Sequence, residues 1–229
     1  MHQKYGQSPG GCPWSDYGLS LIHYTGVRRY VIYAAQIFVS IVLSYLSLIL
    51  YGPLSYNGIP LFYLAAPFYV AFIMWWGAWG MIGVYVGSFF GSGLLFGLGI
   101  LPSLVYSATY LIASMIPFLV YRGLLRKRGI DPFFRDLIYS NIGACKTKRK
   151  EAWLWFISIV VILVNLVGAI IGVGIEYGMG FVPSQVYWLW WFGWVVSGLV
   201  PMLLVTPVVM IGFTRVLEDT NMLNRGWFG

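Results

Sequence analysis

The sequence predicts an all-α membrane protein: a bundle of about six transmembrane helices with both termini in the cytoplasm. Of the 229 residues, 59% are hydrophobic and 9% are charged, which leaves too little charge to cover the surface of a soluble domain. Apolar segments of about 20 residues, the length that crosses a bilayer, recur along the chain. When six such segments are counted, all 14 Lys and Arg residues fall on the cytoplasmic side.

The limits of each span follow from the apolar segments and from the turn residues between them. Arg28 and Arg29 precede the first span and hold its start in the cytoplasm. No short apolar segment with a small-residue cleavage site comes before it, so we expect no cleavable signal peptide. The expected spans are residues 30–51, 61–76, 81–98, 103–121, 153–175 and 187–213.

These spans divide the chain into a cytoplasmic N-terminal segment, a transmembrane domain and a cytoplasmic tail, at residues 1–29, 30–213 and 214–229. A basic cytoplasmic loop, residues 122–150, joins the fourth and fifth spans. We expect it to bind membrane lipids or a partner, through Arg126, Lys127, Arg128, Lys148, Arg149 and Lys150. The net charge of +7 does not indicate nucleic-acid binding, because the cations lie between apolar spans and not on a soluble face.

An enzyme is not expected from the residue types available. The two histidines, His2 and His23, both precede the first span, so haem, zinc and histidine-based hydrolysis lack ligands and bases. Two cysteines, Cys12 and Cys145, are too few and too far apart to indicate a disulfide framework or a metal site. We expect no catalytic residue, no metal and no cofactor.

A candidate ligand site lies on the outer side of this topology, where Glu176 is the one charged residue. A carboxylate beside apolar helices is costly unless it meets water, a partner or a ligand, and solvation in the loop explains Glu176 as well as a ligand does. For Asn165, in mid-span, helix packing is the favoured alternative. Outer aromatic residues suit a pocket for a flat, partly polar small molecule. The expected binding residues are Tyr56, Asn57, Asn165, Glu176, Tyr177, Gln185, Trp188 and Trp191.

Small residues recur at helical spacing within the first span and throughout the third. In the first span they are Ala35, Ser40, Ser44 and Ser47. Such a strip permits close contact with another helix, either within the protein or on a docking partner, and the sequence leaves both open. The third span is rich in glycine, which indicates a central and tightly packed helix.

Two stretches resemble known membrane families. Residues 72–87 resemble the glycine-rich turn between the second and third helices of the substrate-binding S components of energy-coupling factor (ECF) transporters. Residues 194–210 are similar to the last helix of those proteins, and also to the final span of the membrane sensor domain MASE1, which often ends in a run comparable to Leu204-Val205-Thr206-Pro207.

The first resemblance implies a six-helix protein that binds a vitamin or similar micronutrient and docks on a transmembrane coupling subunit driven by two ATPases. Our main interpretation is therefore the substrate-binding subunit of an ECF-type uptake transporter in the cell membrane. Two alternatives stay open: an accessory or scaffold subunit of a larger membrane complex, and a membrane sensory module whose output partner is a separate chain.

Overall fold

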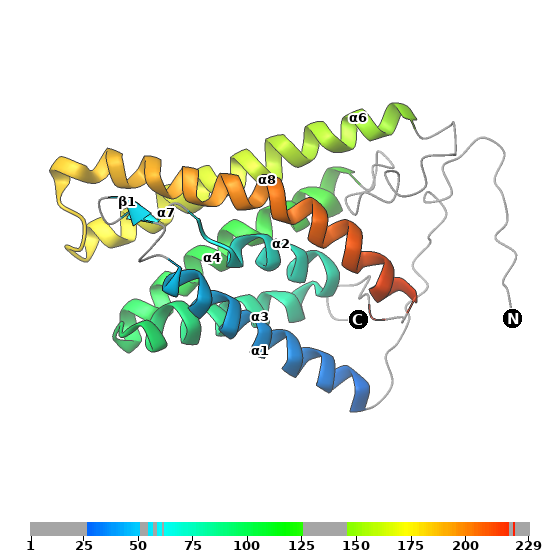
Figure 1. The fold of residues 1–229 in the computed structure, drawn as a ribbon, viewed down its shortest axis with the longest axis horizontal. Helices are drawn as coiled ribbons and strands as arrows, with labels where there is room; N and C mark the ends of the chain where they lie inside the picture. The colour runs from blue at the N-terminus through cyan, green and yellow to red at the C-terminus, as the bar shows by residue number, and fades with distance from the viewer. Residues whose placement is uncertain are drawn as a thin grey trace, which may run out of the picture.

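Long apolar helices make up most of the computed structural model, which describes residues 27–50, 55–56, 59–60, 62–125, 146–219 and 222 (Figure 1). Within these residues, five helices are long and apolar enough to cross a membrane. They cover Tyr30–Ile49, Ala78–Phe96, Ile100–Leu125, Lys150–Gly178 and Ser184–Thr214. The predicted class, an all-α membrane protein, is confirmed.

Several of the spans are composite helices. The α-helices are α1 (Val27–Ile49), α2 (Ala65–Trp76), α3 (Ala78–Ser88), α4 (Ile100–Val120), α6 (Lys146–Trp155), α7 (Val164–Gly178) and α8 (Tyr187–Asp219). Wider π-helical turns extend α3 and α4 and join α6 to α7, at Phe89–Gly93, Tyr121–Leu125 and Phe156–Leu163. A short antiparallel hairpin, β1 (Ser55–Tyr56) with β2 (Ile59–Pro60), lies between α1 and α2.

The second expected span, residues 61–76, differs from the prediction. Helix α2 has 12 residues, and at about 1.5 Å per residue it is too short to cross a hydrocarbon core of about 30 Å. Ten of its residues are buried, so it lies inside the bundle and is covered by the longer helices. Among the described residues, the expectation of about six transmembrane helices therefore becomes five helices long enough to span the membrane and one short, buried helix, α2, which makes the return pass together with the segment before it.

The chain runs back and forth between two ends of the bundle (Figure 1). At one end α1 stops, α3 connects to α4, and α7 connects to α8; we call it the hairpin end, because β1 lies there. At the opposite end, the terminal end, α1 begins, Gly77 turns the chain from α2 into α3, and α8 stops. The described chain thus ends on the side where it begins. Which face of the membrane each end occupies stays a prediction.

Helices α1 and α3 meet along a seam of small residues. A β-carbon built on Gly87 would overlap Ser40, and one on Gly91 would lie 2.5 Å from the β-carbon of Ser44. The Ser47 hydroxyl accepts a hydrogen bond of 2.9 Å from the backbone N–H of Ala65, which fixes α1 to the start of α2. In this structure Ser40, Ser44 and Ser47 are buried and serve internal packing, whereas Ala35 lies on the exposed side of α1.

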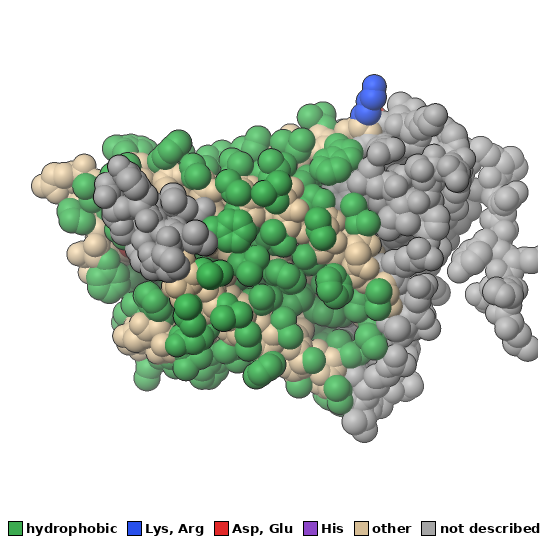
Figure 2. All heavy atoms as spheres, in the orientation of Figure 1, with side chains coloured by type: hydrophobic (Ala, Val, Ile, Leu, Met, Phe, Trp, Pro, Cys, Tyr) green, Lys and Arg blue, Asp and Glu red, His purple; other side chains and the backbone are tan. Residues whose placement is uncertain are grey.

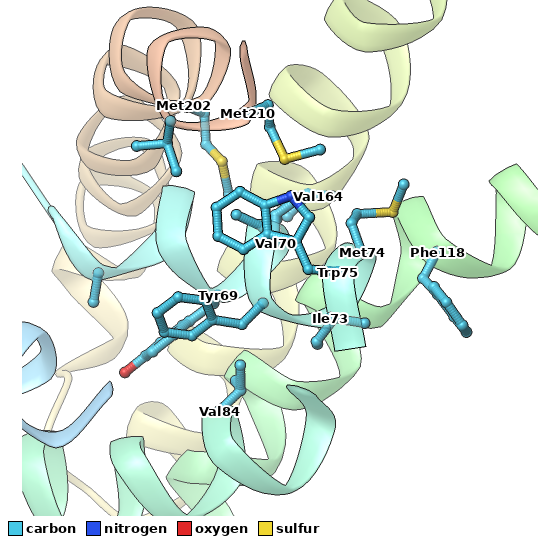
Figure 3. Packing of buried hydrophobic residues seen from close by; sticks show 14 of the residues in the cluster. Tyr69, Val70, Ile73, Met74, Trp75, Val84, Phe118, Val164, Met202 and Met210 are labelled. Atoms are coloured by element: carbon cyan, nitrogen blue, oxygen red, sulfur yellow. The ribbon is translucent and has the colours of Figure 1, made fainter. Parts of the chain in front are cut away.

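The core surrounds α2, whose side chains contact the neighbouring helices on all sides. Figure 3 shows Tyr69, Ile73 and Trp75 between the helices that carry Val84 and Met202. The Trp75 indole N–H donates a 2.9 Å hydrogen bond to the Thr214 hydroxyl of α8. Many outward-facing side chains are also apolar, and green hydrophobic atoms predominate on the described part of the face in Figure 2. Such a surface is solvated by membrane lipids.

Candidate functional site

A cavity of about 240 Å³ lies in the half of the bundle nearer the hairpin end. Its walls come from α1, the start of α2, the segment between α3 and α4, α4, α7, α8 and the turn that follows α7. It extends from Met179 and Val182 in that turn to Val164 and Met202, which lie about halfway along their spans. Residues far apart in the sequence thus form one mostly apolar site.

Four aromatic rings form one wall of this cavity. Tyr110 is stacked between Tyr63 and Trp194, with ring centroids 5.0 Å and 6.2 Å apart. Tyr106, one turn earlier on α4, meets Tyr110 and Trp194 edge to face at 5.3 Å and 5.7 Å. Such contacts hold each ring in a fixed orientation. We call Tyr63, Tyr106, Tyr110 and Trp194 the aromatic wall.

Hydroxyl groups anchor the aromatic wall to the small-residue seam. The Tyr63 hydroxyl is hydrogen bonded to that of Ser92 at 2.9 Å, which joins the start of α2 to the π-helical end of α3. The neighbouring Tyr69 hydroxyl pairs with Ser44 on α1, and the Ser44 hydroxyl donates in turn to the carbonyl oxygen of Ser40. Movement of the wall would therefore be transmitted to α1 and α3.

Glu176 places a carboxyl group at the cavity, near the end of α7. Its Oε1 accepts a hydrogen bond of 3.3 Å from the Tyr106 hydroxyl. Its Oε2 is buried and accepts none. None of the described residues that line the cavity is a Lys, Arg or His. The carboxyl group therefore faces an apolar space with one oxygen unsatisfied, which is costly in the absence of a ligand or water.

Two further polar side chains lie deeper in the cavity. Asn165 donates a 2.6 Å hydrogen bond to the carbonyl oxygen of Val161, one turn earlier in the same helix, and its amide packs directly against Gly198. Thr109 is buried, and its hydroxyl oxygen has no hydrogen-bond partner. The cavity thus holds two groups with unused hydrogen-bonding capacity, Glu176 Oε2 and Thr109 Oγ1.

The structure separates the sequence-predicted binding residues into two groups. Asn165 and Glu176 line the cavity. Tyr177, Gln185 and Trp188 are exposed, and contacts through Tyr187 connect Tyr177 to Trp188 and Trp191 in a separate outer cluster. Tyr56 lies in β1, and Asn57 lies outside the described residues. A binding role for each of these eight residues stays a prediction.

None of the described residues that line the cavity is one of the predicted basic residues. Lys150 is exposed, and Lys148 and Arg149 belong to α6. Arg126, Lys127 and Arg128 lie outside the described residues. Arg122, at the end of α4, is 5.2 Å from the centre of the Phe118 ring. Lipid or partner binding by these cations stays a prediction.

Sequence reasoning missed most of the aromatic wall and Thr109. The available signal was the spacing of Tyr106, Thr109 and Tyr110, which places all three on one face of a helix. A hydropathy profile does not reveal this signal, because it does not distinguish a tyrosine inside a span from the apolar residues around it. In the part of the chain that the structure describes, no three His, Cys, Asp or Glu side chains lie close enough together to hold a metal ion.

Comparison with known proteins identifies the family. The family model for MASE1, a multi-span membrane sensor domain, matches residues 29–227 of the 229. No curated protein and no solved structure matches the chain. Nothing in these comparisons supports an S component of an ECF transporter specifically. The multi-pass membrane architecture agrees with the family match. This chain belongs to the MASE1 family.

Proposed function

We propose that this chain is a membrane sensory domain that detects a small molecule in the cavity beside Glu176. The carrying observation is the unsatisfied Oε2 of Glu176, whose Oε1 accepts a hydrogen bond from Tyr106, at an aromatic and mostly apolar site. Pockets of this kind, mostly apolar with a few convergent polar groups, are the usual form of small-molecule sites. The sensory interpretation replaces uptake as the main reading, because the family match favours it.

Helix α8 provides a physical route from the cavity to the terminal end. It is a continuous helix of 33 residues that contributes Trp194 and Met202 to the cavity. Thr214, near its other end, accepts the hydrogen bond from Trp75 of the buried α2. A ligand that favours one packing of Trp194 would shift the position of α8 relative to α2. We propose that an output partner reads this shift at the terminal end.

We propose binding and not catalysis. The described lining holds one carboxyl group and no Cys, His or Lys. A general acid and base pair or an activated nucleophile would need at least a second such group near Glu176. The expected activity is therefore recognition, with the response produced by the output partner.

The direct test is recovery of the native ligand from a cavity-filling variant. The full chain is purified from its own membranes in mild detergent, and bound small molecules and proteins are identified by mass spectrometry. Ala113 is buried at the cavity, so Ala113→Trp should fill it, whereas Ala34→Trp on the exposed face of α1 is the matched control. We expect a compound that accompanies the wild type and Ala34→Trp but not Ala113→Trp.

Two results would contradict the proposal. Equal recovery of every small molecule from folded Ala113→Trp and from the wild type would remove the cavity as the site. Stoichiometric recovery of a coupling subunit with ATPases, and no signalling protein, would restore the uptake interpretation. Thermal unfolding of each variant checks that it is folded.

A further inference from the structure

We infer that the ligand is a small organic ammonium compound whose N–H group donates to Oε2 of Glu176 and whose apolar body lies against the aromatic wall. This inference rests on the proposed function, because it names the chemical class that the sensory cavity would recognise. Three properties of the cavity support it: its charge, its free hydrogen-bonding groups and its size.

The charge of the cavity is unbalanced. Glu176 is the one Asp or Glu among the described lining residues, and no described Lys, Arg or His accompanies it there. Among the described residues, the other carboxylate with a defined position, Glu151, is exposed at the start of the same span near Lys150. A carboxylate in an apolar site is costly unless it takes up a proton or meets a counter-charge, and a cationic ligand would supply that counter-charge. An anionic ligand would be repelled by Glu176 and would find no cation in the lining.

The hydrogen-bond pattern narrows the class of cation. Tyr106 already occupies Oε1 of Glu176, so the remaining requirement is one donor directed at Oε2. A quaternary ammonium has no N–H to donate, whereas primary, secondary and tertiary ammonium groups do. Charge-assisted hydrogen bonds of this type are stronger than neutral ones. The Thr109 hydroxyl, one turn along α4 from Tyr106, also has no hydrogen-bond partner and is available to a polar group elsewhere on the ligand.

The size and lining of the cavity indicate the properties of the rest of the ligand. Its volume of about 240 Å³ is below the range of about 300–1,000 Å³ that holds drug-sized ligands, so the ligand is small. Tyr106, Tyr110 and Trp194 offer apolar ring surface next to the carboxyl group. A phospholipid with an amine headgroup fits poorly, because its phosphate would find no cation among the described lining residues. The geometry points to a soluble amine.

The test compares two probes of equal size, benzylamine and benzyl alcohol, on the purified full chain in detergent. Ligand-observed NMR titrations give the dissociation constant of each probe for the wild type, Glu176→Gln and Glu151→Gln. The wild type and Glu151→Gln should bind benzylamine about tenfold more tightly than benzyl alcohol. Glu176→Gln, which keeps the size of the side chain, should bind the two probes about equally.

The outcomes separate this inference from the proposed function. Equal affinities for the two probes in the wild type, both lost in Ala113→Trp, would overturn the ammonium class and leave the binding cavity in place. Displacement of benzylamine by phosphatidylethanolamine would overturn the assignment to a soluble amine. Binding of neither probe would overturn the inference, and the proposed function would then be decided by the recovery experiment on Ala113→Trp. Unchanged unfolding temperatures in both glutamine variants exclude misfolding as the cause.

Discussion

At the scale of single residues, Trp194 keeps its place in the aromatic wall because Gly172 carries no side chain. A β-carbon built on Gly172 would lie 2.6 Å from Cη2 of the Trp194 ring and overlap its neighbouring atoms. The indole is rigid and is stacked on Tyr110, so it cannot turn aside without leaving the stack. Two residues further along α7, Gly174 has nothing within 4 Å of the same hypothetical atom.

We therefore predict that Gly172→Ala displaces Trp194 and destabilises the protein by about 1–3 kcal/mol, the usual cost of overpacking. Gly174→Ala is the matched control and should be neutral or stabilising by up to about 1 kcal/mol, because alanine favours helix. Chemical unfolding in detergent measures the free energies, and near-ultraviolet circular dichroism reports the loss of the Tyr110 stack. Equal effects of the two substitutions would contradict this account of Trp194.

Single residues also show how much of a site can be predicted from the sequence. Glu176 stood out because it is the one charged residue on the outer side of the predicted topology, and Asn165 because its amide lies in mid-span; both line the cavity. Tyr63 and Tyr110 carried no such signal, since aromatic residues are common throughout this chain. Only the packing of α2 between α4 and α8 brings their rings together. Side chains from non-adjacent segments cannot be paired from one sequence.

At the scale of elements, the seam between α1 and α3 depends on glycine in the same way. Gly83, Gly87 and Gly91 are spaced by four residues and face Gln36, Ser40 and Ser44, which have the same spacing. We predict that Gly87→Ala, which would press on the backbone of Ser40, lowers the free energy of unfolding by about 1–3 kcal/mol. Gly212→Ala on α8, where the new atom meets nothing within 4 Å, is the control.

Thermal unfolding in matched detergent gives the comparison for the seam. If Gly87→Ala and Gly212→Ala unfold at the same temperature, the close approach of α1 to α3 is not required. The substitution acts by separating two helices, so its effect extends beyond the side chain that is changed. It should therefore also weaken the pairing of Ser44 with Tyr69, which is made across the bundle from α1 to α2.

The elements themselves were largely predictable. Hydropathy placed the first span at residues 30–51, and the structure gives Tyr30–Ile49. The exception is α2, because hydropathy records apolar content and not whether a segment faces lipid or protein. A helix buried on nearly every side has the same composition as a span, and Tyr63, just before it, lies outside any regular element. The π-helical turns were also missed, since no composition marks them.

At the scale of the whole molecule, the polar groups are divided between the two ends. Glu176 and the cavity lie toward the hairpin end, whereas Arg122 and Lys150 lie toward the terminal end. Helix α8 connects the two ends without interruption. A molecule arranged in this way suits detection at one face and response at the other. Detection of a molecule from outside the cell would require that the hairpin end face outward, which is the topology that the distribution of Lys and Arg predicts.

That orientation gives the last prediction. In a background in which Cys12 and Cys145 are replaced by serine, single cysteines are introduced as Phe181→Cys at the hairpin end and Val216→Cys at the terminal end. Both side chains are 55% exposed and lie beyond the ends of the apolar spans Lys150–Gly178 and Ser184–Thr214, so both sites should be accessible to a water-soluble thiol reagent. A membrane-impermeant maleimide should label Phe181→Cys in intact cells and Val216→Cys only after permeabilisation. The reverse pattern would place the terminal end, with Arg122 and Lys150, outside the cell, against the positive-inside rule. The cavity would then lie on the cytoplasmic side.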